Sequence, residues 1–299
     1  MSRIAYVNGA YVAHRHAAVH IEDRGYQFAD GVYDVVGVAA GRLTDEGLHL
    51  DRLDRSLGEL SIRPPMSRQA LRFIMSEVIR RNKVRDGMVY IQITRGVAPR
   101  DHGFPLMAEP AVVITARGMK PIDPAVVARG ISVISLPDQR WKRCDIKTIS
   151  LLPNVLAKQT AKENGAYEAW LVDDAGMVTE GSSTNAWIVT SKGVLVTHAP
   201  AAAILNGVTR RSVIRLAKQA GIKTEERKFS LAEARAAREA FLTSTTNYVL
   251  PIVRIDGRPV ADGKPGPFSR RLRDAYVSYM AGEPFPAAET RPRKTNRGR

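Results

Sequence analysis

The sequence has one cysteine, Cys144, and no run of apolar residues long enough to cross a membrane. A single cysteine forms no disulfide within its own chain, and without a Cys/His cluster it makes no zinc site. A spanning helix needs about 18 or more consecutive apolar residues, and the first residues lack the basic and then apolar order of a signal peptide. We therefore expect a cytoplasmic protein without a metal site and without a membrane partner.

Acidic residues are few relative to basic ones, since 45 Lys and Arg face 30 Asp and Glu and give a formal net charge of +15. Such a charge suggests nucleic-acid binding. However, the stretch 291–299 alone carries five basic residues and no acid, and the chain has no zinc-finger, RNA-binding or basic-zipper motif. We interpret 286–299 as a basic, disordered tail and do not expect nucleic acid as the main partner.

The chain also lacks the glycine-rich motifs of nucleotide-binding folds and a regular alternation of strand and helix. Its apolar pattern predicts an α+β protein of two domains, residues 1–120 and residues 125–285, joined by the proline-containing segment 117–124. The first domain is expected to hold strands at 4–7, 33–38, 88–94 and 111–116 and two amphipathic helices, one with Leu50, Leu53, Leu57 and Leu60 on its apolar face and one capped by Ser67. The second is expected to hold helices near 153–164, 209–220, 230–236 and 268–280.

Four segments contain residues that one cofactor, pyridoxal phosphate, would need. Lys147 is flanked by apolar residues, which suits a lysine that acts as a nucleophile. Glu180 lies in a polar segment that we expect to be a loop between two strands. Val208 and Thr209 begin a predicted helix, whose free N–H groups favour a phosphate. A run of hydroxyls at 243–246 follows a predicted strand.

Each of these segments also has an ordinary interpretation. Lys147 could be a surface lysine at the end of a strand, and Glu180 a solvated acid in a loop. Thr209 could be a simple helix cap, and the hydroxyl run a polar turn. Only their combination favours the cofactor.

Taken together, the segments resemble the fold-type IV pyridoxal-phosphate aminotransferases, within them the enzymes that act on D-amino acids. The resemblance runs in family order from about residue 4 to residue 280, and the tail lies outside it. It rests on Glu22–Tyr33, Asp51–Leu53, Thr94–Gly96, Pro99–His102, Arg143–Lys147, Leu156–Gln159, Thr179–Ser183, Gly207–Arg210 and Thr243–Thr246. It implies a smaller N-terminal α/β domain and a larger C-terminal mixed α/β pseudo-barrel domain.

The resemblance also implies roles for single residues. Lys147 would bind the cofactor covalently and later move the α-proton of the substrate, while Glu180 would keep the ring nitrogen protonated. Leu205 would pack against the ring. The phosphate would be held by a larger set, namely Arg52, Val208, Thr209, Ser244 and Thr245.

Three further positions match those that hold the substrate carboxylate: Tyr33, Arg100 and His102. In the family pattern the last two reach in from the neighbouring subunit, so the resemblance implies a homodimer. Asp101 between them is a departure that could weaken the hold on acidic substrates. The planar donors of a guanidinium can bond both oxygens of a carboxylate.

The implied reaction is transamination between a D-amino acid of the D-alanine type and a 2-oxo acid, 2-oxoglutarate or pyruvate. Branched-chain L-amino-acid aminotransferases share the lysine, glutamate and phosphate segments but not the Arg-x-His pair. Aminodeoxychorismate lyase is a third possibility with the same scaffold. A basic binding protein that has kept the scaffold without the chemistry is the alternative from another class.

Overall fold

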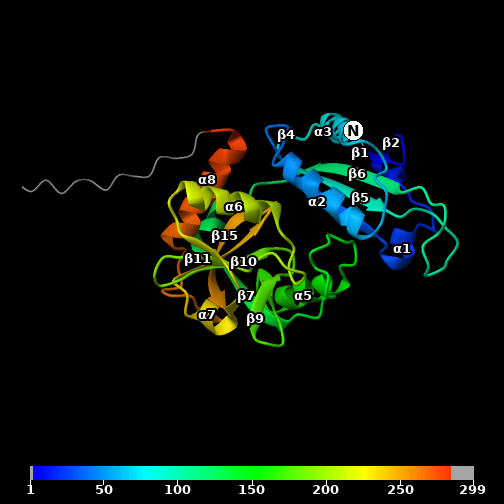
Figure 1. The fold of residues 1–299 in the computed structure, drawn as a ribbon. Helices are drawn as coiled ribbons and strands as arrows, with labels where there is room; N and C mark the ends of the chain where they lie inside the picture. The colour runs from blue at the N-terminus through cyan, green and yellow to red at the C-terminus, as the bar shows by residue number, and fades with distance from the viewer. Residues whose placement is uncertain (1–2, 284–299) are drawn as a thin grey trace, which may run out of the picture.

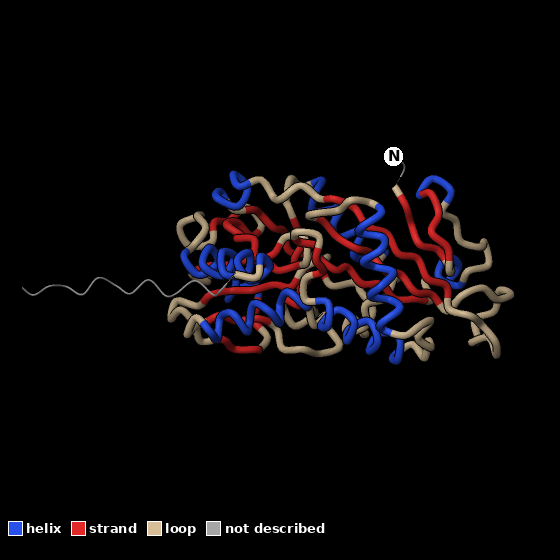
Figure 2. Tube along the Cα trace, turned by 90° about the horizontal axis from the view of Figure 1, so that it is seen from above, coloured by secondary structure: helices blue, strands red, loops and turns tan. Residues whose placement is uncertain are grey.

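The computed structural model describes residues 3–283. The predicted basic tail at 286–299 therefore lies outside the described residues. Within them the chain forms two sheets, one built from strands before residue 119 and the other from strands after residue 130. Seen from above, the two sheets lie toward opposite ends of the molecule (Figure 2).

The first sheet has six strands in the order β2-β1-β6-β5-β3-β4 (Figure 1). The strand β5 pairs antiparallel with β3 on one side and with β6 on the other along its whole length. A short 3-10 helix, His14–His16, and the helix α1, Arg24–Phe28, lie between β2 and β3. The strands are β1 Ile4–Val7, β2 Ala10–Ala13, β3 Gly31–Ala39, β4 Arg42–Leu43, β5 Gly87–Thr94 and β6 Ala111–Gly118.

Two helices cover one face of this sheet. The helix α2, Glu46–Glu59, packs on β3, and α3, Arg68–Arg81, packs on β6. The Ser67 hydroxyl accepts the N–H of Ala70, which confirms the predicted cap. Leu60, expected on the apolar face of the first helix, lies just beyond the end of α2 and is only partly buried.

Successive side chains along β3 lie in two different environments, one on each face of the sheet. Along β3, Val32, Val36 and Val38 belong to the hydrophobic core under α2 and α3. The residues between them face the other side of the sheet, because successive side chains of a strand point to opposite faces. Only one face of the sheet is therefore filled by its own helices.

The segment between the sheets is shorter than predicted. The expected linker 117–124 overlaps the end of β6 at its start, and its last residue begins a helix, α4 Pro124–Arg129, that the pattern did not reveal. Asp123 caps this helix by accepting the N–H of Ala125, and Pro124 occupies its first turn, where a missing N–H is tolerated.

The second sheet has ten strands and curls into a half-barrel (Figure 1). Its path is β12-β11-β10-β14-β15-β7-β8-β9-β13, and β16 pairs with β15. The strands are β7 Ile131–Pro137, β8 Glu168–Val172, β9 Met177–Gly181, β10 Asn185–Val189, β11 Leu195–Thr197, β12 Thr224–Glu226, β13 Phe229–Ser230, β14 Glu239–Ser244, β15 Tyr248–Ile255 and β16 Arg258–Pro259.

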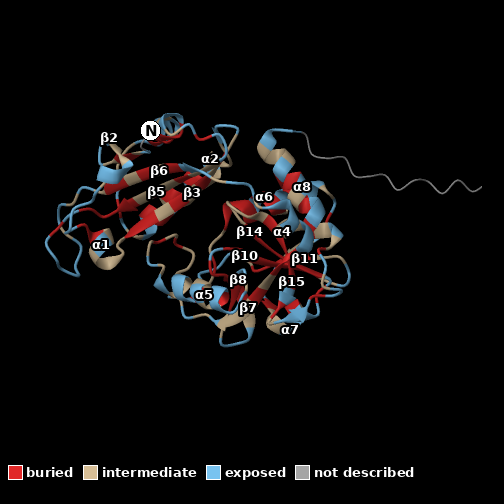
Figure 3. Cartoon of the chain, turned by 180° about the vertical axis from the view of Figure 1, so that it is seen from behind, coloured by how far each residue is buried: buried red, intermediate tan, exposed pale blue. Residues whose placement is uncertain are grey.

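Helices and aromatic pairs complete this second unit, whose strands are largely buried (Figure 3). Trp187 on β10 stacks on Phe241 of β14, with ring centroids 5.3 Å apart. Helices α6 and α8 share a hydrophobic cluster with these strands, and α5 packs on β8. The helices are α5 Leu152–Glu163, α6 Val208–Gln219, α7 Leu231–Arg235 and α8 Pro267–Ala281, close to the predicted ranges.

Residues 3–283 contain neither a membrane-spanning helix nor a cluster of metal-binding side chains. None of their helices combines the length and the apolar character that a bilayer crossing requires. No three His, Cys, Asp or Glu side chains of the same residues are placed so that they could hold a metal ion.

Candidate active site

A cavity of about 340 Å³ brings together residues from both sheets. Tyr33 and Met88 line it from the first sheet, and Glu180 and Ser244 from the second. Most of the residues proposed from the sequence for the cofactor and substrate line this cavity: Tyr33, Arg52, Lys147, Glu180, Leu205, Val208, Thr209, Ser244 and Thr245. Segments more than 100 positions apart in the chain thus meet at one place.

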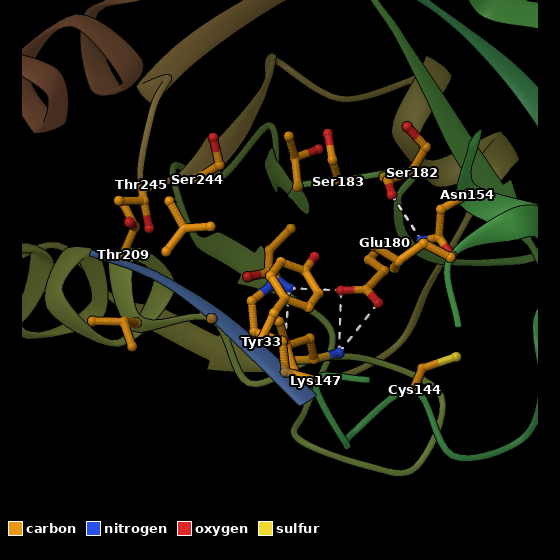
Figure 4. A pocket seen from close by; sticks show the side chains of 18 of the residues that line it. Tyr33, Cys144, Lys147, Asn154, Glu180, Ser182, Ser183, Thr209, Ser244 and Thr245 are labelled. Atoms are coloured by element: carbon orange, nitrogen blue, oxygen red, sulfur yellow. Dashed lines mark hydrogen bonds between the residues drawn. The ribbon is translucent and has the colours of Figure 1, made fainter. Parts of the chain in front are cut away.

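Lys147 is fixed by backbone pairing with β3. The N–H of Tyr33 donates to the Lys147 carbonyl over 3.0 Å, and the N–H of Ile149 donates to the Gly31 carbonyl over 3.1 Å. The strand-like segment 147–149 therefore lies along an edge of β3 that β4 leaves open. The Lys147 Nζ lies 4.1 Å from the centre of the Tyr33 ring and faces the cavity (Figure 4).

Glu180 is a strand residue, so the predicted loop position was wrong. It belongs to β9 and is 5% exposed. Burial raises the pKa of Glu180 above its ordinary value, while Arg140 and the N–H of Leu205 oppose this effect. Figure 4 shows Tyr33 and Lys147 between Glu180 on one side and Thr209, Ser244 and Thr245 on the other.

Two residues that the sequence reasoning missed hold the Glu180 carboxylate. Arg140 forms an ion pair with it and also binds Asp138. The amide of Asn185 donates to Glu180 Oε2 over 3.0 Å and to the Leu205 carbonyl over 2.8 Å. No local pattern marks Arg140, because its partner lies 40 positions further along the chain.

The opposite end of the cavity suits an anion. The helix α6 has 12 residues, and its N-cap, Gly207, supplies no side-chain cap. The first N–H groups of such a helix are free to bind a phosphate. Val208 and Thr209, which begin α6, both line the cavity.

The predicted hydroxyl run lies beside this helix end but is divided between strand and turn. Thr243 and Ser244 are the last two residues of β14, and Thr245 and Thr246 follow it, so the expectation that the whole run comes after the strand was wrong. All four line the cavity.

Arg52 reaches the cavity from α2 and is held by a buried carboxylate. Its Nε and Nη2 donate to Asp34 over 2.9 and 2.8 Å, and Asp34 also bonds the His49 Nδ1 over 2.7 Å. Burial opposes ionisation, but Arg52 and His49 outweigh it and hold the pKa of Asp34 well below its usual range. Asp34 therefore fixes the direction of the Arg52 guanidinium.

Arg100 and His102 lie away from the cavity of their own chain. Both are exposed on the loop between β5 and β6. The Arg100 guanidinium carbon lies 4.6 Å from the centre of the Phe28 ring, and the His102 ring centre lies 5.4 Å from it. Asp101 caps the same loop by accepting the N–H of Gly103. This chain alone does not bring the pair to Lys147.

Cys144 also lines the cavity, but it is not suited to act as a nucleophile. Burial raises the pKa of Cys144 to about 11. A thiol with such a pKa stays protonated near neutral pH, and the thiolate is the reactive form. Lys147 is therefore the better candidate for covalent chemistry.

The model of the amino-transferase class IV family matches residues 31–255. The chain belongs to the class IV aminotransferases. This confirms the family resemblance seen in the sequence. The matched range includes Lys147, Glu180 and the start of α6, so the family assignment covers the cavity as well as the fold.

The class IV chain has relatives of similar length. It is 40% identical to the D-alanine aminotransferase of Bacillus licheniformis over 277 residues, which are 92% of this chain and 96% of that protein. It is 41% identical to the D-alanine aminotransferase of Listeria innocua over 276 residues, which are 92% and 95% of the two chains. For the Staphylococcus aureus enzyme of the same name the identity is 38%.

Solved structures of branched-chain amino acid aminotransferases share the class IV fold. One such enzyme, from T.th. and solved with pyridoxamine 5'-phosphate, has a TM-score of 0.88 at 25% identity, with 95% of this chain and 96% of that chain covered. The Escherichia coli enzyme has a TM-score of 0.86 at 23% identity, with 96% and 97% covered, which shows the fold alone. These likenesses confirm the predicted α+β fold of two domains; the exact domain boundaries stay a prediction.

We predict that Asp34→Asn lowers the free energy of unfolding by about 3 kcal/mol near pH 7, because it leaves the partly buried Arg52 without its counter-charge. Asp34 has a lower pKa in the folded chain than the ordinary value of about 4, so its contribution is present above about pH 4 and is lost as the pH falls below it. The difference in the free energy of unfolding between wild type and variant should become smaller below that pH.

Denaturant unfolding at several pH values measures this difference. Asp174→Asn is the matched control, since Asp174 is exposed in the turn between β8 and β9. An equal loss in both variants, or a gap for Asp34→Asn that does not change with pH, would contradict the assignment.

We predict that Gly207→Ala disturbs the support of Glu180. A Cβ at Gly207 would lie 2.0 Å from Asn185 Oδ1, and the Asn185 amide is held by Glu180 and Leu205. Displacing this side chain should lower the free energy of unfolding by about 1 to 3 kcal/mol. Gly47→Ala is the control for the same measurement, because a Cβ at Gly47 meets open space; equal stability of the two variants would refute the prediction.

Proposed function

We propose that this chain is a pyridoxal-phosphate-dependent transaminase of D-amino acids of the D-alanine type, with 2-oxoglutarate or pyruvate as the amino acceptor. The observation that carries the proposal is the position of Lys147, whose amine faces a cavity with a buried carboxylate at one end and an uncapped helix start at the other. The D-alanine aminotransferases at 38 to 41% identity support the substrate class.

The donor set fits pyridoxal phosphate at three points. Glu180, held by Arg140 and Asn185, would accept a hydrogen bond from the protonated ring nitrogen. A buried carboxylate that is already fixed in place is well suited to this role. Leu205 would pack against the ring. The phosphate would be bound by Arg52, the N–H groups of Val208 and Thr209, and the hydroxyls of Ser244 and Thr245.

When bound, the cofactor withdraws electrons from the substrate's α-carbon, which makes the α-proton acidic. Lys147 would hold the cofactor through Nζ. Once released from it, Lys147 would take up the α-proton of the substrate on Nζ and then donate this proton to the product. The cation on Arg52 would keep the phosphate end fixed during this transfer. Because Lys147 projects from a backbone paired with β3, its amine has a defined approach to one face of the site.

Substrate binding would use Tyr33, together with Arg100 and His102 of a second copy. In support, Tyr33 lines the cavity, whereas Arg100 and His102 are exposed and outside it. Exposed apolar side chains, the kind of surface that a second copy would cover, lie on α5 and on the loop before β6. These are Leu152 at 68%, Val155 and Leu156 at 57%, Phe104 at 64% and Met107 at 88% exposure. We propose a homodimer for this reason, and the cytoplasm as its location because one free cysteine suits a reducing compartment.

We predict that Lys147→Ala abolishes turnover and the visible absorbance of the bound cofactor, because among residues 3–283 Lys147 supplies the one lysine amine of the cavity lining. The purified wild-type protein, loaded with pyridoxal phosphate, should lose its visible band on addition of D-alanine and keep it with L-leucine. Loss with L-leucine alone would assign the chain to the branched-chain enzymes. A colourless wild type, even after addition of the cofactor, would overturn the proposal in favour of a binding protein.

We predict that Arg100→Ala strongly raises the KM for D-alanine while the cofactor stays bound. Mixing this variant with Lys147→Ala should restore about a quarter of the wild-type sites if subunits exchange at random, because half of the dimers then hold one complete site. Activity assays and size-exclusion chromatography of the mixture measure this outcome. If the mixture stays inactive although mixed dimers form, Arg100 does not act across the subunit boundary.

A further inference from the structure

The strand register places Arg117 on the cavity side of the first sheet. Gly37 of β3 is opposite Met88 of β5, and Met88 is opposite Arg117 of β6. Residues that are directly opposite on neighbouring strands share one face of the sheet. Tyr33 and Val35 share this face with Gly37, because they precede it by four and two residues. All of these but Gly37 line the cavity.

Arg117 is the arginine of the cavity lining that lacks an acidic neighbour. Arg52 is paired with Asp34, and Arg140 is paired with Glu180. Among residues 3–283, no carboxylate lies within ion-pair distance of the Arg117 guanidinium, and its Nη2 lies 4.0 Å from the sulfur of Met88. Its charge is therefore available to an anion that enters the cavity.

Gly37 and Arg117 stand at opposite ends of this cross-strand row, with Met88 between them. A Cβ built on Gly37 would make ordinary contacts, 3.5 Å from Thr245 Cγ2 and 3.7 Å from Thr44 Cβ. The Gly37 end of the row is therefore the end next to Thr245, and Arg117 lies at the other end.

The anion that fits Arg117 is a carboxylate of the substrate. The phosphate of the cofactor is already served by Arg52 and by the start of α6, and the α-carboxylate by Tyr33 and its proposed partners. We propose that Arg117 binds the distal carboxylate of dicarboxylic substrates, such as D-glutamate as donor and 2-oxoglutarate as acceptor. Arg117 is then a specificity-determining residue. This inference rests on the proposed function.

The test compares Arg117→Met with wild type in the half-reaction of the cofactor-loaded enzyme, followed by the visible absorbance. The kcat/KM ratio of D-glutamate over D-alanine should fall about tenfold, the value expected for one hydrogen-bonded ion pair at the rim of a site. Arg117→Lys should retain part of the preference. The control is Arg258→Met, an exposed arginine on β16 outside the cavity, which should leave the ratio unchanged.

Binding provides a second readout that does not need turnover. Glutarate should bind the loaded wild type more tightly than butyrate in calorimetry, and Arg117→Met should remove this difference. An unchanged ratio in Arg117→Met, or a wild type that turns over D-alanine but rejects both D-glutamate and 2-oxoglutarate, would overturn the inference. An equal loss for both donors with weaker cofactor binding would also overturn it, because Arg117 would then serve the phosphate.

The two proposals fail in different ways. A wild type without turnover of any D-amino acid would refute the proposed function, while the glutarate measurement would still decide the role of Arg117. Normal turnover of D-alanine with no effect of Arg117→Met would refute only the inference about Arg117.

Discussion

The site depends on the pairing of residues 147–149 with the edge of β3. The short strand β4 covers only the end of β3, which leaves the backbone at 31–33 without a neighbour on that side. An open strand edge binds another extended segment readily, and the chain supplies one in the two backbone hydrogen bonds between these segments. Lys147 is thereby joined to the first sheet, although Glu180 of the second sheet and the start of α6 complete the cavity.

Along β3, side chains that stabilise the core alternate with side chains that line the cavity. Val32 and Val36 belong to the core under α2 and α3, whereas Tyr33 and Val35 line the cavity. A shift of the register by one residue would exchange these two sets. The same rule places Arg117 in the cavity from β6, two strands away from Tyr33. One face of the sheet thus belongs to the hydrophobic core, and the opposite face lines the cavity.

Buried charges at both ends of the cavity are neutralised by neighbours that hold them in place. Isolated buried charges are very unfavourable, and Asp34 and Glu180 are both nearly inaccessible. Asp34 is balanced by Arg52 and His49, and Glu180 is balanced by Arg140. These pairs hold Arg52 and Glu180 in fixed positions before any ligand arrives, so little reorganisation is needed on binding.

The sequence by itself determined the fold class, most of the longer elements and the candidate residues of the site. Helix caps such as Ser67 act within a few residues, and apolar periodicity and family motifs are also readable along the chain. The helices α2, α3 and α5 to α8 could therefore be predicted, whereas the short helices α1 and α4 were not. Only the tertiary structure revealed that Arg140 supports Glu180, that Glu180 lies in a strand, and that Arg117 reaches the cavity. These facts depend on side chains that lie far apart in the sequence and meet through the register and curvature of two sheets, which no local pattern encodes.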